Sequence, residues 1–170
     1  VVLCEDDEVV ETVVAEAPLQ TPYIPGLLSF REGEAIIKAL TKVERTPDLV
    51  LFDGSGRIHY REAGIATHVG VVFNTPSVGV AKNLLCGKPK HNEVMKEGER
   101  APILADETVK TVSDAVIGYA YQSRQYESDS RHINPLHISP GHLVDEAQAV
   151  QLVKPHCDQY KLPRPIRRAD

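Results

Sequence analysis

The sequence has few cysteines and no long apolar segment, and each of these absences excludes a class of protein. Its three cysteines, Cys4, Cys86 and Cys157, are widely spaced and form no Cys-x-x-Cys pair, which argues against a disulfide framework and against a zinc site. No apolar run approaches the length of a membrane-spanning helix, and the amino-terminal residues are acidic where a secretion signal would be basic. We therefore expect a soluble, cytoplasmic protein that makes no contact with a membrane.

Size and charge limit the architecture but leave the partner open. The chain has 170 residues, of which 42% are hydrophobic, enough for one core but short for two, so we expect a single domain over residues 1–170. A net charge of -5 argues mildly against a nucleic-acid partner, because phosphate binding depends on Lys and Arg. A nuclease, however, gathers carboxylates to hold metal ions, and these lower the net charge without removing local basic patches.

The apolar pattern predicts an α/β fold in which helices flank a mixed sheet. Strands are expected in four apolar runs: 48–52, 77–81, 115–122 and 135–139. Helices are expected where apolar residues fall at helical spacing: 30–43, 63–73 and 143–153. The β-branched runs 1–3 and 9–15 predict a hairpin, or a strand that leads into a helix, and the non-periodic stretch 86–107 predicts a solvated excursion.

Two carboxylates are the first candidates for chemistry. Glu32 falls in the first turn of the 30–43 helix, and Asp53 ends the 48–52 strand, so the two could share a site. Mg2+ prefers oxygen ligands and retains waters, one of which can attack a phosphodiester. Each residue also has a structural explanation, because Ser29-x-x-Glu32 fits a helix capping box and Asp53-Gly54 fits an ordinary turn.

Several motifs occur in one order along the chain. They are PYIPGLLSFREG at 22–33, LFDGSGRIH at 51–59, GIATHVG at 64–70, GVAK at 79–82, NPLHISPGH at 134–142 and KLPRPIRRAD at 161–170. In order and spacing they resemble the endonuclease V family over nearly the whole chain, and only residues 88–110 are loosely similar. The resemblance implies a ribonuclease H-like α/β fold with a mixed central sheet.

The same resemblance implies a metal site and its ligands. Glu32, Asp53 and Asp170 look like the carboxylates that hold Mg2+, for which Mn2+ can substitute, and His59 and Lys82 look like catalytic neighbours of the metal. Members of the family also carry an aspartate on a first strand that no residue here matches, so we expect the chain to be shortened at its amino end.

His59 and Lys82 also have simpler explanations from the residues alone. A single histidine is more often a structural hydrogen-bonding group, and a lysine at a strand end is usually solvated. His68 is interpreted as structural or as a residue that contacts a ligand of the site. His137 and His142 are interpreted as structural or as phosphate contacts, and we expect them to flank a Pro-Gly turn.

The loop around Tyr23 resembles the wedge of the family, which separates the strands while the damaged base is flipped into a pocket. Two prolines stiffen this loop, and Pro22, Tyr23 and Ile24 are expected to touch the nucleic acid. The alternative is a tyrosine packed on the edge of the core.

Three glycines are candidates for contact with the flipped base. At Gly54, Gly56 and Gly64 the backbone could approach the base closely. Turn geometry explains the first two equally well.

The function implied by the resemblance is a Mg2+-dependent endonuclease of DNA repair that acts at inosine. It would hydrolyse the second phosphodiester bond on the 3′ side of the lesion, and we expect a monomer that binds inosine-containing DNA, with RNA also open as a substrate. One alternative is an inosine-binding module whose catalysis is impaired by the unmatched aspartate. Another is a ribonuclease H-like nuclease that acts on branched or flapped nucleic acid.

Overall fold

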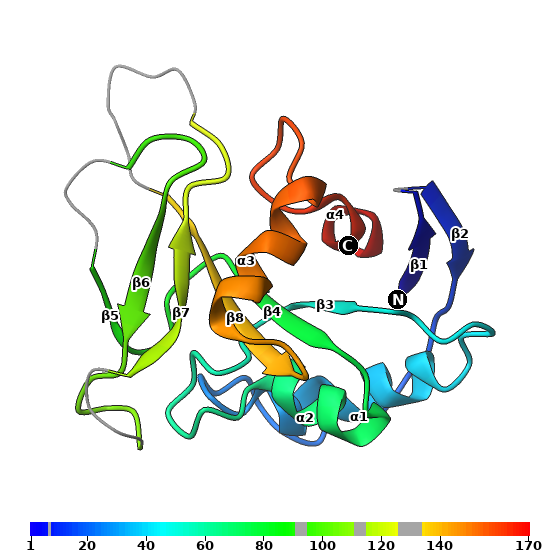
Figure 1. The fold of residues 1–170 in the computed structure, drawn as a ribbon. Helices are drawn as coiled ribbons and strands as arrows, with labels where there is room; N and C mark the ends of the chain where they lie inside the picture. The colour runs from blue at the N-terminus through cyan, green and yellow to red at the C-terminus, as the bar shows by residue number, and fades with distance from the viewer. Residues whose placement is uncertain (7, 91–94, 111–114, 126–133) are drawn as a thin grey trace.

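The computed structural model describes residues 1–6, 8–90, 95–110, 115–125 and 134–170, and a six-stranded sheet forms its centre (Figure 1). The strands stand in the order β3 (Val50–Asp53), β4 (Ser77–Ala81), β8 (Leu136–His142), β7 (Val116–Tyr121), β6 (Arg100–Leu104) and β5 (Lys88–Pro89). β3 and β4 run parallel, whereas the other neighbouring pairs are antiparallel. The mixed sheet predicted from the sequence is therefore confirmed.

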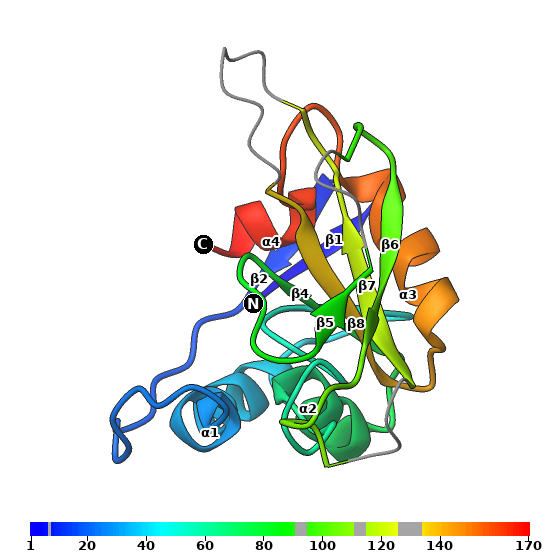
Figure 2. The same ribbon diagram turned by 90° about the vertical axis from the view of Figure 1, so that its left-hand side faces the viewer.

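Helices cover both faces of this sheet (Figures 1 and 2). They are α1 (Leu28–Leu40), α2 (Ile65–Phe73), α3 (Glu146–Val153), the 3-10 turn η1 (Lys154–His156) and α4 (Arg164–Ala169). On one face α1 and α2 pack around Phe52 of β3. On the other, α3 and α4 pack on Val78, Val80 and Leu51, because successive side chains of a strand point to opposite faces. The helix α4 has no counterpart among the predicted helices.

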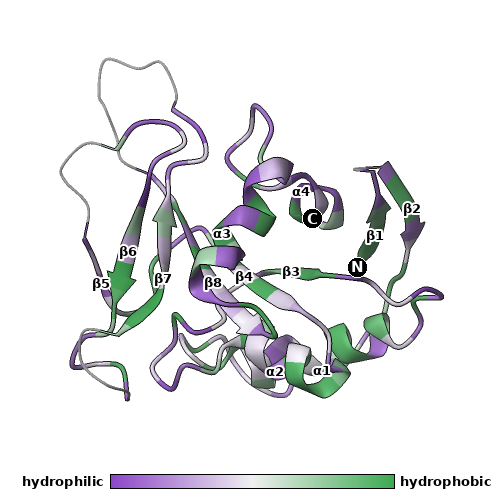
Figure 3. Cartoon of the chain, viewed as in Figure 1, coloured by the Kyte–Doolittle hydropathy of each residue, from purple (hydrophilic) through white to green (hydrophobic). Residues whose placement is uncertain are grey.

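The unit β3–α2–β4 places the ends of two parallel strands side by side. The sequence predicted both strands and the helix, and the observed bounds differ by at most two residues at each end. β3 lies at the end of the sheet, however, so Val50 and Leu51 are only half-buried and the expectation of a strand buried on both faces is wrong. Figure 3 shows hydrophobic residues along β3 and α1 and hydrophilic ones on many connecting loops.

A separate two-stranded hairpin precedes α1. It consists of β1 (Val2–Glu5) and β2 (Glu8–Thr12), which confirms the hairpin alternative for the first β-branched runs. Arg45, which lies beyond α1, pairs with Glu5 and so links the hairpin to the rest of the molecule. β1 is not part of the central sheet, and a gap in strand pairing separates it from β3.

The expected solvated excursion over residues 86–107 is wrong, because this stretch contains β5 and β6. β6 pairs with β7 and buries Ala101 and Ile103, while Met95 is buried in the same apolar cluster. β6 has only five residues, in which buried and more exposed positions alternate, and it contains Pro102. Because proline is rare inside strands and the alternation is so short, the sequence of this segment resembles that of a loop.

The expected Pro-Gly turn between His137 and His142 is also wrong. β8 continues through Pro140 and Gly141 to His142, and the register of its pairing with β4 shifts near Ser77. The Pro140 carbonyl is used instead by the Arg57 amide, which donates to it at 2.9 Å. The Nε2 atom of His142 lies 3.1 Å from Oδ1 of Asn74, a contact that supports a structural role for His142.

Among the helices of the described residues, none combines the length and the apolar character that a membrane crossing requires.

Candidate functional site

Asp53 and Lys82 meet at the carboxyl ends of β3 and β4. Asp53 is the last residue of β3, Lys82 follows β4 directly, and the lysine Nζ donates to the aspartate Oδ2 at 3.1 Å. Both side chains remain accessible, at 40% and 46% of their full exposure. The hydrogen bond to Asp53 and the negative charge of that carboxylate raise the pKa of Lys82 above its usual value. The lysine therefore stays cationic beside the carboxylate.

Glu32 projects from the second turn of α1 and does not cap the helix. The residue before α1 is Leu27, no side chain caps this end, and Ser29 lies inside the helix, so the capping-box alternative is wrong. The Glu32 side chain is about half-exposed, at 47%, and its nearest cation is Arg31 at 3.9 Å. Glu32 is thus available for a role other than supporting its own helix.

One cavity of about 770 Å³ brings the three candidate ligands together. Glu32, Asp53 and Asp170 all line it, together with apolar residues of β1, α1 and β3. The cavity lies where β1 and β3 leave their edges unpaired with each other, and residues of α4 also line it. Residues far apart in the sequence therefore face one space.

The donor chemistry of this cavity suits a hard divalent cation. Carboxylate oxygens are the ligands that Mg2+ and Mn2+ accept, and the lining supplies all three predicted carboxylates. Within the described ranges, no group of three or more His, Cys, Asp or Glu side chains is already gathered as a ligand set. The cavity thus offers suitable donors from three elements, but not a closed cage.

The predicted wedge residues stand on an exposed loop. Pro22, Tyr23 and Ile24 are exposed, and Tyr23 retains 68% of its surface, so it is not packed on the edge of the core. The loop is held at its base, where the Leu27 amide donates to the Ile24 carbonyl at 2.9 Å. Arg31 donates from Nη1 to the Thr21 carbonyl, also at 2.9 Å. The tyrosine thus projects from a fixed base.

His59 supports this loop from beneath. It is buried, with 9% exposure; its Nε2 lies 2.9 Å from the Gly26 carbonyl and its Nδ1 lies 3.2 Å from the Arg61 amide. The amide can only donate, so Nδ1 accepts and Nε2 carries the proton that reaches Gly26. Both ring nitrogens are engaged with backbone, and His59 does not line the cavity. These contacts fix the position of His59 beneath the loop.

Two of the three candidate glycines are packed against protein backbone and the third against side chains. A Cβ at Gly56 would lie 2.1 Å from the Pro140 carbonyl oxygen, and one at Gly64 would lie 2.1 Å from the Ser55 carbonyl oxygen. Gly54 has φ +158°, and a Cβ there would meet Ile65. The space around these glycines is therefore occupied within the folded chain, which accounts for them without a bound base.

His68 lies on α2 and packs on the neighbouring helix. Its ring meets Phe30 of α1 edge-on, with 6.1 Å between the ring centroids. This contact agrees with the structural interpretation of His68.

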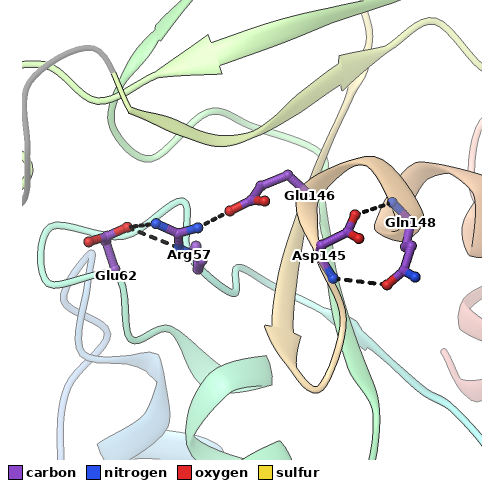
Figure 4. A network of polar contacts seen from close by, with 5 residues as sticks. All are labelled: Arg57, Glu62, Asp145, Glu146 and Gln148. Atoms are coloured by element: carbon purple, nitrogen blue, oxygen red, sulfur yellow. Dashed lines mark hydrogen bonds and ion pairs between the residues drawn. The ribbon is translucent and has the colours of Figure 1, made fainter.

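An ion-pair network that the motifs did not single out ties the loop after β3 to α3 (Figure 4). Arg57 donates from Nε to Glu62 at 3.0 Å, and its guanidinium also pairs with Glu146 in the first turn of α3. Asp145 caps that helix through the Gln148 amide, in a full capping box. The capping pattern Asp-x-x-Gln was readable in the sequence, whereas a pairing between residues 57 and 146 leaves no local signal.

A second feature outside the predicted site is a basic hollow next to Lys82. Lys161 and Arg167 line it together with Lys82 and Tyr160. Both new cations lie within the KLPRPIRRAD motif, so their charge was the signal that could have drawn attention to them.

Comparison with known proteins agrees with this geometry. The family model described as Endonuclease V matches residues 1–170. An endonuclease V from Haloarcula marismortui is 56% identical over 100% of this chain, which spans 64% of that relative, and one from Halobacterium salinarum is 54% identical, with 65% of its length spanned. The chain therefore spans slightly less than two thirds of these relatives.

Solved structures show the same fold. A crystal structure of endonuclease V from Bacillus subtilis superposes with a TM-score of 0.80 at 33% identity, over 96% of this chain and 65% of that one. Endonuclease V from Ciona intestinalis, in complex with DNA containing an inosine, superposes with a TM-score of 0.71 at 29% identity, over 91% of this chain and 66% of the other. The sheet is thus of the ribonuclease H-like type, and the chain belongs to the endonuclease V family.

Proposed function

We propose that this chain is a metal-dependent endonuclease that nicks nucleic acid at inosine, at the second phosphodiester bond on the 3′ side, in DNA repair. The observation that carries the proposal is the cavity shared by Glu32, Asp53 and Asp170, with Lys82 bonded to Asp53. The relative from Ciona intestinalis supports inosine-containing DNA as the ligand, because that enzyme was crystallised with it. The single domain is proposed to act as a monomer, on DNA and also on RNA.

In this proposal Glu32, Asp53 and Asp170 hold the cation. Mg2+, or Mn2+ in its place, supplies an activated water and a counter-charge for the phosphate when bound. Lys82 remains protonated beside Asp53 and places a positive charge where the phosphate oxygens gather negative charge.

The loop at Tyr23 supplies access to the base. Opening a base stack costs a few kcal/mol, so the inserted residue must be held firmly. The loop of Tyr23 meets this requirement through the hydrogen bonds of Ile24, Gly26 and Thr21 at its base. The aromatic ring itself stays free to enter the stack.

The test is cleavage of an end-labelled oligonucleotide that contains one inosine, with Mg2+, with Mn2+ and with EDTA. Glu32→Gln should lower the cleavage rate about 100-fold or more, because a metal ligand is lost. Glu34→Gln is the matched control, since Glu34 is an exposed residue of the same helix that pairs with Lys38 and does not line the cavity. Absence of nicking with either metal, or equal rates for the two variants, would refute the proposal.

A second candidate is an inosine-binding module with impaired catalysis. It is favoured by one observation: within the part of the chain that is described, the carboxylates are not gathered into a three-residue ligand set. Binding to a flipped base depends less on that set than hydrolysis does. A gel shift with the same oligonucleotide separates the two, because the module binds inosine selectively and leaves the strand intact even in Mn2+. Equal cleavage of a flap without inosine would indicate a different nuclease specificity.

A further inference from the structure

A hollow of about 430 Å³ lies beside the candidate active site, because Lys82 lines it and also bonds Asp53 of the larger cavity. It is formed where three segments meet: the residues after β4, the residue Asn134 before β8, and the connection from η1 to α4. Lys82, Lys161 and Arg167 line it, and its described lining includes no carboxylate. A protein of net charge -5 therefore concentrates three cations around one small space.

Arg167 is fixed in this hollow by contacts that leave its outer nitrogens available. Its guanidinium carbon lies 3.8 Å from the centre of the Tyr160 ring, and its Nε donates to the Leu162 carbonyl at 3.1 Å. Stacking on an aromatic ring sets the plane of a guanidinium and reduces the entropy it loses on binding. Among the described carboxylates, none lies within 4 Å of Arg167.

Lys161 adds a second cation that is also without an ion pair in the described ranges. Its ammonium donates to Oδ1 of Asn134, and its side chain is partly buried. Burial lowers the pKa of Lys161 from its usual value, and the positive charge of Lys82 lowers it further. The two ammonium groups are thus close enough to repel each other, a state that a bound anion relieves.

We infer that this hollow binds a phosphodiester group of the nucleic-acid strand, adjacent to the bond that the carboxylates attack. The inference rests on the proposed function for the identity of the strand. A planar guanidinium and an ammonium that line one hollow match the oxygens of a phosphate, which accept from both. Lys82 borders the hollow and also bonds Asp53, so a phosphate held here sets the register of the strand relative to the cavity.

The experiment measures strand binding without cleavage. Affinity for an inosine-free and an inosine-containing oligonucleotide is followed by fluorescence anisotropy in EDTA, over a range of salt concentrations. Lys161→Gln removes one charge and keeps a side chain able to bond Asn134. Arg167→Lys is a second variant that keeps the charge but loses the planar guanidinium with its paired N–H donors. Lys38→Gln is the control with the same charge change, on an exposed face of α1.

For Lys161→Gln we expect weaker binding to both oligonucleotides by about 3-fold to 10-fold at low salt. The slope of log affinity against log salt should fall by about 0.7–0.9, the value for one lost phosphate contact. Arg167→Lys should weaken binding with a smaller change in slope. Lys38→Gln should match the unaltered protein. A slope for Lys161→Gln equal to that of Lys38→Gln, in folded protein, would overturn the inference.

Two further arms separate this inference from its alternatives. Inorganic phosphate is compared with chloride at equal ionic strength. A selective loss of strand binding in phosphate, absent from Lys161→Gln, supports the inference because the two compete for the hollow, whereas phosphate that binds without displacing the strand would show that the hollow takes the free ion instead. Cleavage is measured in parallel on the same variants. If Lys161→Gln changes the salt slope but the unaltered protein never cleaves, the phosphate site is supported and the proposed nuclease function is refuted. If the slope is unchanged and cleavage is normal, the nuclease function is supported and the phosphate site is refuted.

Discussion

The Lys82 ammonium lies 3.1 Å from the Asp53 carboxylate although 29 positions separate the two residues in the sequence. The contact follows from the parallel pairing of β3 and β4, in which Asp53 stands opposite Val80 and Lys82 follows two residues later. Side chains two residues apart on a strand point to the same face, so Lys82 continues the face of Val80. The topology alone therefore brings a carboxylate and its cation to one edge of the sheet.

Replacing Lys82 should separate catalysis from folding. We expect Lys82→Met to lower cleavage about 100-fold, as loss of one charge stabiliser does, while the free energy of unfolding falls by less than about 1 kcal/mol because the pair is half-exposed. The pKa of Lys82 is raised, so its side chain keeps the positive charge to a higher pH than an ordinary lysine does. Cleavage by the unaltered protein should therefore show no loss from this group between about pH 7 and 10. Stopped-time assays across that range, with urea melts of both proteins, provide the check.

His59 should control the wedge loop rather than the chemistry. His59→Ala removes the hydrogen bond to the Gly26 carbonyl and leaves the Arg61 amide without its acceptor, so we expect a loss of about 1–3 kcal/mol in unfolding free energy. Tyr23→Ala should leave stability unchanged, because the ring is largely exposed, but should reduce the preference for inosine over normal DNA.

The measurements are thermal melts, and fluorescence of 2-aminopurine placed beside the inosine, which reports unstacking. His59→Gln, which can bond both partners, should recover most of the stability. A direct chemical role for His59 would instead appear as a change in the pH profile of cleavage with unchanged unstacking.

The sequence predicted the site better where the fold repeats a regular pattern. The ends of β3 and β4 followed from two apolar runs, and these ends place Asp53 and Lys82. Loop contacts gave no such signal: the resemblance singled out His59, but its burial depends on Gly26 in a different loop, which no local pattern reveals. The start of α1 was also predicted wrongly. Ser29 has the sequence pattern of a helix cap, but the helix begins at Leu28, so Glu32 lies in the second turn.

Gly56 should tolerate no side chain, whereas Gly33 should accept one. A Cβ at Gly56 would lie 2.1 Å from the Pro140 carbonyl oxygen, so Gly56→Ala should destabilise the protein by about 1–3 kcal/mol or more. Gly33 lies inside α1, where a Cβ would make an ordinary contact of 3.9 Å with Ile65. Gly33→Ala should therefore stabilise by up to about 1 kcal/mol, since alanine favours helices. Urea denaturation measures the free energy of unfolding of both variants. A Gly56→Ala protein as stable as the unaltered one would contradict the prediction and show that β8 can move away from residue 56.

Arg57 should hold the loop after β3 against α3 (Figure 4). Arg57→Met keeps the apolar stem but leaves Glu62 and Glu146 unpaired and partly buried, and we expect a loss of about 1–2 kcal/mol in unfolding free energy. Glu146→Gln should cost less, because Arg57 keeps its bond to Glu62. A double-mutant cycle measures the coupling, and additive effects would mean that the two residues do not interact in solution.

The two buried cysteines should resist alkylation until the protein unfolds. Burial raises the pKa of the Cys86 and Cys157 thiols to about 12, so neither forms the reactive thiolate near pH 8. Because these pKa values are raised on folding, their contribution to stability is complete below the ordinary thiol pKa and declines as the pH rises toward 12.

Mass spectrometry after iodoacetamide treatment at pH 8 should find both thiols unmodified without urea and modified with it. The half-buried Cys4 serves as the internal comparison. Modification of Cys86 in folded protein at the rate seen in urea would mean that the cluster around Met95 and Ile103 opens readily.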